Sequence, residues 1–223
     1  MNFVLQPVYS NRGVLFGVEC LTRNGSQAGW AESFFRNAEC KVLNDFLSAQ
    51  LDMIEQCYSW FEKNRIRISI NLRSDSLDFI SLPHIKSKLT RMQLLCLEVD
   101  EKDTNILSQI NFPLLNSISN PLWLDDFGSG VRWPSSKIDQ YVSVVKVDKF
   151  FFWDAIESED TFIRLLNLVR DFYSRNIKVI IEGIENQSHL DALKRFDNVM
   201  AQGFCWKEIA VDELLTLPLT VDL

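Results

Sequence analysis

Two adjacent carboxylates, Asp125 and Asp126, follow the short apolar run 121–124 and precede a loop that contains two glycines. The run is typical of a buried strand, so we expect both acids at a strand end. Burying one carboxylate costs free energy, and two neighbouring carboxylates also repel each other. A hard divalent cation bound through carboxylate oxygens would supply the opposite charge. The alternative is that the two acids cap the next turn or helix.

Six further apolar runs also end in a polar side chain. These side chains are Glu19, Asn71, Glu98, Lys146, Glu182 and Gln202. Each alone is ordinarily a helix cap or a solvated strand end, but in a barrel of parallel strands they would meet on one face. Their carboxylates would repel strongly there, because Lys146 supplies only one positive charge. The pattern predicts two Mg²⁺ or Mn²⁺ ions bridged by Asp125 and Asp126, a site suited to phosphodiester cleavage.

The elements that would position these side chains alternate along the chain. We expect strands over residues 3–9, 14–19, 67–71, 94–98, 121–124, 142–148, 178–182 and 199–203. We expect helices over residues 32–64 (two helices), 74–92, 103–119, 154–176, 187–195 and 211–217. A turn at residues 11–13 would join the first two strands as a hairpin. The alternation predicts an α/β fold with a parallel sheet, and about eight strands favour a (β/α)8 TIM-type barrel.

Length and composition fit a single domain over residues 1–223 and narrow the function classes. Hydrophobic residues make up 47% of the chain, ample for a packed core. The net charge of −7 disfavours a nucleic acid polymer as partner, and no apolar run is long enough for a membrane span. Five cysteines without a CxxC pair and the lack of a visible signal peptide predict a cytoplasmic protein. Neither a GxGxxG nor a P-loop motif is present.

The polar strand ends lie in short motifs whose order resembles that of the EAL-domain phosphodiesterases of bacterial cyclic di-GMP signalling. In chain order the motifs are Gln6-Pro7, Glu19-Cys20-Leu21 with Arg23, Asn71-Leu72, Leu97-Glu98-Val99-Asp100-Glu101, Asp125-Asp126-Phe127-Gly128-Ser129-Gly130, Lys146-Val147-Asp148, Glu182-Gly183-Ile184-Glu185 and Gln202-Gly203. They resemble the family's QP, EAL, NLS, LExTE, DDFGTG, KxD, EGVE and QG. The shared order and spacing over nearly the whole chain make the set specific.

The resemblance implies a modified barrel whose first strand runs antiparallel to the others. It also implies two Mg²⁺ or Mn²⁺ ions and the hydrolysis of one phosphodiester bond of cyclic di-GMP, giving linear pGpG. One ion would be held by Glu19, Asn71, Glu98 and Asp125. The other would be held by Asp125, Asp126 and Glu182.

The resemblance assigns catalytic roles as well. Lys146 would position the attacking water, and Glu182 is the candidate general base. Glu101 would hold the loop after Asp126 in its working shape. The alternatives are that Lys146 forms a salt bridge toward a helix and that Glu101 is a charge at a helix N-terminus.

Substrate contacts and partners follow from the same resemblance. Arg23 would contact a phosphate of cyclic di-GMP, and Gln6 and Gln202 would also bind the substrate, with Gln202 in addition supporting the metal ligands. The alternative for Arg23 is a surface ion pair. A homodimer is expected, and a regulatory protein partner is a further possibility.

The chain departs from the family's pattern most clearly at one residue and in two segments. Arg73 replaces the serine of Asn-Leu-Ser, and residues 131–134 read Val-Arg-Trp-Pro where the family usually has Tyr-Ser-Ser. Residues 204–208 read Phe-Cys-Trp-Lys-Glu and lack the usual Gly-Arg-Pro. We therefore expect substrate grip, affinity and rate to differ from those of typical members.

Three functions compete at this point. An active phosphodiesterase is favoured, because every ligand position carries a competent residue. A non-catalytic cyclic di-GMP receptor or protein-docking regulator is the alternative, although such relatives generally lose several of these residues. A different metal-dependent barrel enzyme, such as a Mg²⁺/Lys enolate former, is disfavoured by the Asp-Asp pair and by the motif order.

Overall fold

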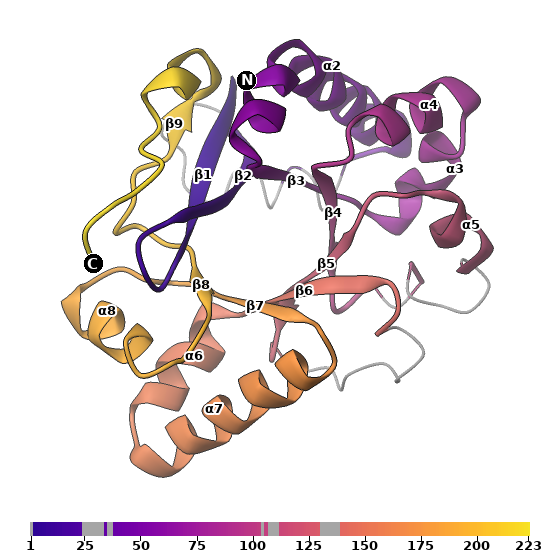
Figure 1. Cartoon of the computed structure of the whole chain (residues 1–223). Coiled ribbons are helices and arrows are strands. Elements are labelled where there is room, and N and C mark those ends of the chain that lie inside the picture. The colour runs from indigo at the N-terminus through magenta and orange to yellow at the C-terminus, as the bar shows by residue number, and fades with distance from the viewer. Residues whose placement is uncertain (1, 24–33, 35–37, 104, 107–111, 130–138) are drawn as a thin grey trace.

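The computed structural model of the chain describes residues 2–23, 34, 38–103, 105–106, 112–129 and 139–223. The strands in this part are β1 (Asn2–Ser10), β2 (Leu15–Arg23), β3 (Arg67–Asn71), β4 (Leu95–Asp100), β5 (Leu122–Phe127), β6 (Val142–Val147), β7 (Lys178–Ile181), β8 (Met200–Ala201) and β9 (Ile209–Ala210). Strands β2 to β8 follow one another around the sheet, and β1 joins β8 to β2. In Figure 1 these strands ring the centre and the helices lie outside them. The predicted TIM-type barrel is confirmed.

Strand β1 is the one barrel strand that breaks the parallel pattern. It pairs antiparallel with both β2 and β8, whereas β2 to β8 pair parallel with one another. The predicted hairpin and the antiparallel first strand are therefore confirmed. Because β1 is reversed, its N-terminal half lies beside the C-terminal end of β2, with Gln6 paired to Glu19 and Asn2 to Arg23.

The helices surround the barrel. They are α2 (Cys40–Asn64), α3 (Leu77–Ile80), α4 (Pro83–Arg91), α5 (Phe112–Ser117), α6 (Lys149–Ile156), α7 (Glu159–Ser174) and α8 (Gln187–Leu193), with 3-10 turns η1 (Ser74–Ser76) and η3 (Val211–Thr216). Helix α2 buries one face, including Leu47, Leu51 and Ile54, in the main hydrophobic core. This is the face that its helical spacing predicts.

Several predicted helices have different bounds. The predicted helix 154–176 is two helices, because Asp148 caps α6 and Ser158 caps α7 through side-chain hydrogen bonds to backbone N–H groups. The predicted helix 74–92 is divided, with Pro83 at the start of α4. The predicted helix 211–217 is the 3-10 turn η3. Parts of the predicted helices 32–64 and 103–119 lie outside the described residues.

The barrel interior has two layers, an apolar one and a polar one. The apolar layer is a buried cluster of Val8, Cys96, Trp123, Val144, Ile180 and Met200, with Phe16 packed against it. It is separate from the main core, which includes the alternate strand residues and the helices. Side chains two positions apart share one face of a strand. Glu98, Asp125 and Lys146 follow apolar-layer residues by two positions, so they also point into the barrel.

The C-terminal segment covers β1 from outside. Strand β9, which was not predicted, pairs antiparallel with β1. Further along, the Tyr9 hydroxyl donates to the Pro218 carbonyl at 2.9 Å, and the Leu15 N–H donates to the Leu219 carbonyl at 2.9 Å. Figure 1 shows this yellow segment alongside β1. The end of the chain is thereby tied to the hairpin at its beginning.

Candidate active site

Lys146 lies at the centre of the polar layer, where its ammonium group contacts four carboxylates. Its Nζ atom is 3.0 Å from Glu19 and 2.9 Å from each of Glu98, Asp125 and Glu182. The Lys146 side chain is only 1% exposed. The salt bridge considered for Lys146 thus exists, but it is directed into the barrel and not toward a helix.

Two amides complete the polar layer. Asn71 Nδ2 donates to Glu19 Oε1 at 3.0 Å, and Gln202 Nε2 donates to Glu19 Oε2 at 2.8 Å. Gln202 is buried, yet its Oε1 atom has no hydrogen-bond partner within the described part of the chain. A buried acceptor of this kind calls for a partner from outside the chain, such as a water or a hydrated cation.

Burial dominates the ionisation of these carboxylates. It raises the pKa of Glu98 well above its usual value and the pKa of Glu182 to about 8. Burial would also raise the pKa of Glu19, but the Lys146 charge and the hydrogen bonds to Glu19 lower it overall. Burial would lower the pKa of Lys146, but the surrounding carboxylates raise it well above its usual value. One lysine is therefore too little positive charge for this layer.

Asp125, Asp126 and Glu182 have the spacing of a metal site. One oxygen from each residue lies within 4.8 Å of the others. Burial, followed by the neighbouring charge of Asp125, raises the pKa of Asp126 to about 6. An all-oxygen donor set with excess negative charge fits Mg²⁺ or Mn²⁺. These are the residues predicted for the second ion, and those predicted for the first ion, Glu19, Asn71, Glu98 and Asp125, belong to the polar layer around Lys146.

Glu101 lies against the loop that follows Asp126. Its Oε2 atom accepts a hydrogen bond from the Gly128 N–H at 3.2 Å, and its Oε1 atom accepts one from the Ser129 hydroxyl at 2.9 Å. Gly128 has a φ of 98°, and a side chain there would collide with Phe151. These contacts suit the loop-holding role, which stays a prediction. The departure at residues 131–134 lies outside the described residues.

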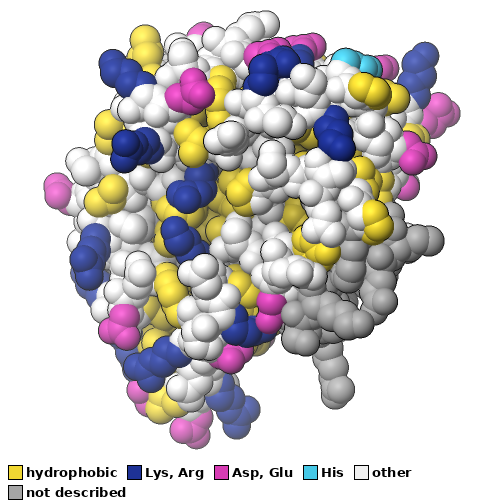
Figure 2. Space-filling view, turned by 45° about the vertical axis from the view of Figure 1, so that its right-hand side comes forward, with side chains coloured by type: hydrophobic (Ala, Val, Ile, Leu, Met, Phe, Trp, Pro, Cys, Tyr) yellow, Lys and Arg dark blue, Asp and Glu magenta, His cyan; other side chains and the backbone are white. Residues whose placement is uncertain are grey.

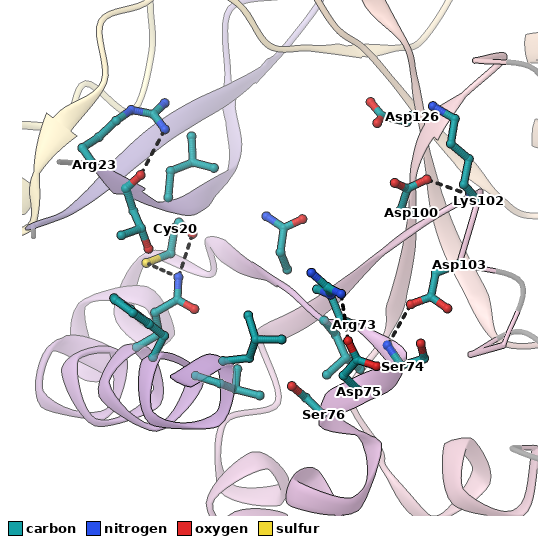
Figure 3. A pocket seen from close by; sticks show the side chains of 18 residues that line it. Cys20, Arg23, Arg73, Ser74, Asp75, Ser76, Asp100, Lys102, Asp103 and Asp126 are labelled. Atoms are coloured by element: carbon teal, nitrogen blue, oxygen red, sulfur yellow. Dashed lines mark hydrogen bonds and ion pairs between the residues drawn. The ribbon is translucent and has the colours of Figure 1, made fainter. Parts of the chain in front are cut away.

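Arg23 forms an ion pair, as its alternative interpretation stated. Its Nε and Nη2 atoms are 3.1 and 2.9 Å from Glu208 Oε2. Arg23 also lines a cavity of about 710 Å³ together with Asn71 and Asp126. Figure 3 shows Arg23 on one side of this cavity and Asp126 on the other. Gln6 is half-buried and pairs in register with Glu19, at the edge of the polar layer.

Three side-chain contacts near the site have no signal in the sequence, although Glu208 itself lies in the segment 204–208 that departs from the family's pattern. One is the contact of Glu208 with Arg23. The other two hold the loop after Glu182, the candidate base. Trp153 Nε1 donates to the Gly183 carbonyl at 2.9 Å, and His189 Nδ1 lies 2.9 Å from the same oxygen. All three contacts join different structural elements. No periodicity or motif in the sequence indicates them.

The sequence of this barrel matches one protein family along most of its length. A family model described as the EAL domain matches residues 1–208. The chain belongs to the EAL domain family. The resemblance seen in the sequence is therefore confirmed at the level of the family.

Curated relatives of this EAL domain have differing functions. The chain is 26% identical to the cyclic di-GMP phosphodiesterase PdeH of Escherichia coli K12, over 91% of the chain and 81% of PdeH. It is 23% identical to YdiV of the same organism, whose name describes an anti-FlhC(2)FlhD(4) factor, over 95% of the chain and 92% of YdiV. It spans as little as 19% of some longer relatives. Relatedness at this level leaves open which function the chain has.

Solved structures share the fold. The crystal structure of the EAL-like domain protein YdiV superposes with a TM-score of 0.84, at 19% identity over 99% of the chain and 96% of YdiV. The cyclic di-GMP complex of the PaMucR phosphodiesterase superposes with a TM-score of 0.77, at 22% identity over 96% of the chain and 98% of that structure. The same barrel therefore occurs in a structure with cyclic di-GMP bound and in YdiV.

One face of the described surface is mixed in character. Figure 2 shows one face on which basic, acidic and apolar side chains are interspersed. Within the described residues, no helix is both long and apolar enough to cross a membrane.

Proposed function

We propose that this EAL domain hydrolyses one phosphodiester bond of cyclic di-GMP and releases linear pGpG. The observation that carries the proposal is the buried polar layer, in which one lysine faces four carboxylates beside an oxygen-ligand group that suits a metal. A layer with this much uncompensated charge is costly to fold, so its presence argues for ligands that restore the balance. The proposal treats residues 1–223 as one functional unit.

Glu19, Asn71, Glu98 and Asp125 would hold one ion, and Asp125, Asp126 and Glu182 the other. Two bound Mg²⁺ or Mn²⁺ ions would stabilise the charge on the attacking and leaving oxygens.

Three residues act on the attacking water and the loop beside it. Lys146 orients the water, and Glu182 accepts its proton as the water oxygen attacks phosphorus. The bond from phosphorus to one ester oxygen of the cyclic dinucleotide breaks, and that oxygen takes a proton from solvent water, which leaves a phosphate monoester at one end and a hydroxyl at the other. Glu101 keeps the loop after Asp126 in place through Gly128 and Ser129.

Substrate would enter through the cavity beside the polar layer. Its volume of about 710 Å³ lies within the usual range for small-molecule sites, and Asn71 and Asp126 connect its wall to the metal ligands. Arg23 would pair with a phosphate of the substrate, with Gln6 and Gln202 on the same side. The proposal includes a homodimer. It also includes a cytoplasmic location, which the five free thiols favour.

A second candidate is a non-catalytic receptor or a regulator that docks on another protein. Two observations favour it: the TM-score of 0.84 to YdiV, and the Arg23 guanidinium paired with Glu208 where a substrate phosphate is expected. Against it stands the retention of every predicted ligand residue in the polar layer.

Product analysis tests the choice. The purified protein is incubated with cyclic di-GMP and Mn²⁺, and the nucleotides are separated by chromatography. We expect linear pGpG that disappears with EDTA and with Glu19→Ala. Intact substrate that still binds would support the receptor, and neither cleavage nor binding would support the protein-docking regulator. If the protein is a receptor or a protein-docking regulator, Glu19→Ala should leave the binding of its partner unchanged.

A further inference from the structure

The ion pair between Arg23 and Glu208 lies at the edge of the cavity proposed for the substrate. Arg23 ends β2 and lines the cavity, and Glu208 directly precedes β9. Figure 3 shows the Arg23 side chain at the rim, across the cavity from Asp100 and Lys102. The pair thus involves the cation that the proposed function assigns to a substrate phosphate.

The Glu208 carboxylate engages the guanidinium through two of its nitrogens. Arg23 Nε lies 3.3 Å from Oε1 and 3.1 Å from Oε2, and Nη2 lies 2.9 Å from Oε2. A phosphodiester group uses the same donors when it binds arginine side-on. The two anions therefore compete for one edge of the guanidinium.

The backbone keeps this competitor close. Strand β9 pairs with β1 through Val4 and Leu5, and Val4 also pairs with Leu21 of β2. Only β1 therefore lies between β2 and β9, which follows Glu208 directly. This arrangement keeps the Glu208 carboxylate near Arg23 at a high effective concentration. The side chains of Arg23 and Glu208 are 36% and 37% exposed, so a ligand can reach the pair. Exposed ion pairs are weak, and a ligand with two phosphates can displace such a carboxylate.

We infer that Glu208 is an affinity-determining residue that competes with the substrate phosphate for Arg23. The inference rests on the proposed use of Arg23 for phosphate binding. Residues 204–208 lack the Gly-Arg-Pro of the family that the sequence resembles, and the carboxylate of Glu208 stands there beside Lys207. The enzyme would consequently need more substrate for half-saturation, with its chemistry unchanged.

The test is a double-mutant cycle with Glu208→Gln and Arg23→Ala. We measure KM and kcat with Mn²⁺, and the Kd for cyclic di-GMP by calorimetry with Ca²⁺ in place of Mn²⁺. Glu208→Gln should lower KM and Kd about two- to fivefold, the range set by the loss of one exposed ion pair, without a matching change in kcat. In the Arg23→Ala background the same substitution should change neither constant.

Glu159→Gln is the matched control. Glu159 of α7 forms another exposed ion pair, with Arg195, and the substitution removes one charge from that pair. It should leave KM and Kd unchanged. The inference is overturned if Glu208→Gln does not lower Kd, or if it lowers Kd equally without Arg23. Tighter binding by Glu208→Gln without any hydrolysis would support the inference and reject the phosphodiesterase. Hydrolysis together with a Kd that Glu208→Gln leaves unaltered would support the phosphodiesterase and reject the inference.

Discussion

The two layers inside the barrel are built from the same strands but have opposite energetics. In the apolar layer, Trp123 and its neighbours are excluded from water and carry no charge. Two residues after Val144 of that layer, Lys146 is surrounded by carboxylates that range from fully buried Glu98 to Asp125 and Glu182, which are 18% and 19% exposed. Burial stabilises the first layer through the hydrophobic effect, whereas in the second it opposes the charges it encloses. The protein retains an unfavourable layer directly above a favourable one, which is the expected sign of a functional site.

The first test removes the single cation from the polar layer. Lys146→Met leaves four carboxylates, two of them buried, without their counter-charge, so we expect a loss of about 3–5 kcal/mol in the free energy of unfolding. Hydrolysis of cyclic di-GMP should be lost as well. Urea unfolding at pH 8 measures the change, and a loss below about 1 kcal/mol would show that Lys146 does not balance this layer.

The second test opens a void in the apolar layer. Trp123→Ala removes a fully buried indole, and we expect a loss of about 3–5 kcal/mol from lost burial and cavity formation. This loss should be the same at pH 6 and pH 8, because no neighbour in the layer changes its charge over that range. Urea unfolding at both pH values is the measurement. A strongly pH-dependent loss would contradict the separation of the two layers.

The third test uses the raised pKa of Glu182. Its pKa in the folded protein is about 8, above the ordinary value of 4.5, so the folded state binds the proton more tightly than the unfolded state does. Stability of the metal-free protein should therefore fall as the pH rises from 6 to 8, by at most about 1.4 kcal/mol per pH unit for this group. The raised pKa of Asp126, about 6, contributes in the same direction at the lower end of this range.

Glu182→Gln provides the control for that test. The variant lacks the titrating carboxyl, so its unfolding free energy should change less between pH 6 and pH 8. Equal slopes for the variant and the parent protein would mean that Glu182 does not carry the effect.

The contrast between the layers also explains what the sequence could predict. Polar residues at the ends of apolar runs are visible in the sequence, and a barrel of parallel strands brings these ends to one face, so Glu98, Asp125 and Lys146 are expected together. The predicted strand 121–124 is too short, because β5 extends to Phe127 and Asp125 and Asp126 lie within it. The Asp pair therefore does not merely cap a following helix.

Features that depend on distant contacts could not be predicted. Strand β9 has only two residues, and its pairing with β1 arises from the closed barrel. The contact between Glu208 and Arg23 spans 185 positions in the sequence and depends on that pairing. By contrast, the break between α6 and α7 had a local signal, because Ser158 followed by Glu159 and Asp160 is typical of a helix N-terminus.

The most direct test of the account is a titration with Mn²⁺, followed by calorimetry and thermal unfolding, for the parent protein and for Asp125→Asn. Asp125 contacts Lys146 and also belongs to the oxygen-ligand group, so it joins both halves of the polar layer. We predict that Mn²⁺ binds the parent protein and, at a hundred times its Kd, stabilises it by about 2.7 kcal/mol. Asp125→Asn should lose most of this stabilisation, whereas Trp123→Ala should keep it. An absence of Mn²⁺ binding to the parent protein, or equal stabilisation of Asp125→Asn, would contradict the central claim that the polar layer is a metal centre.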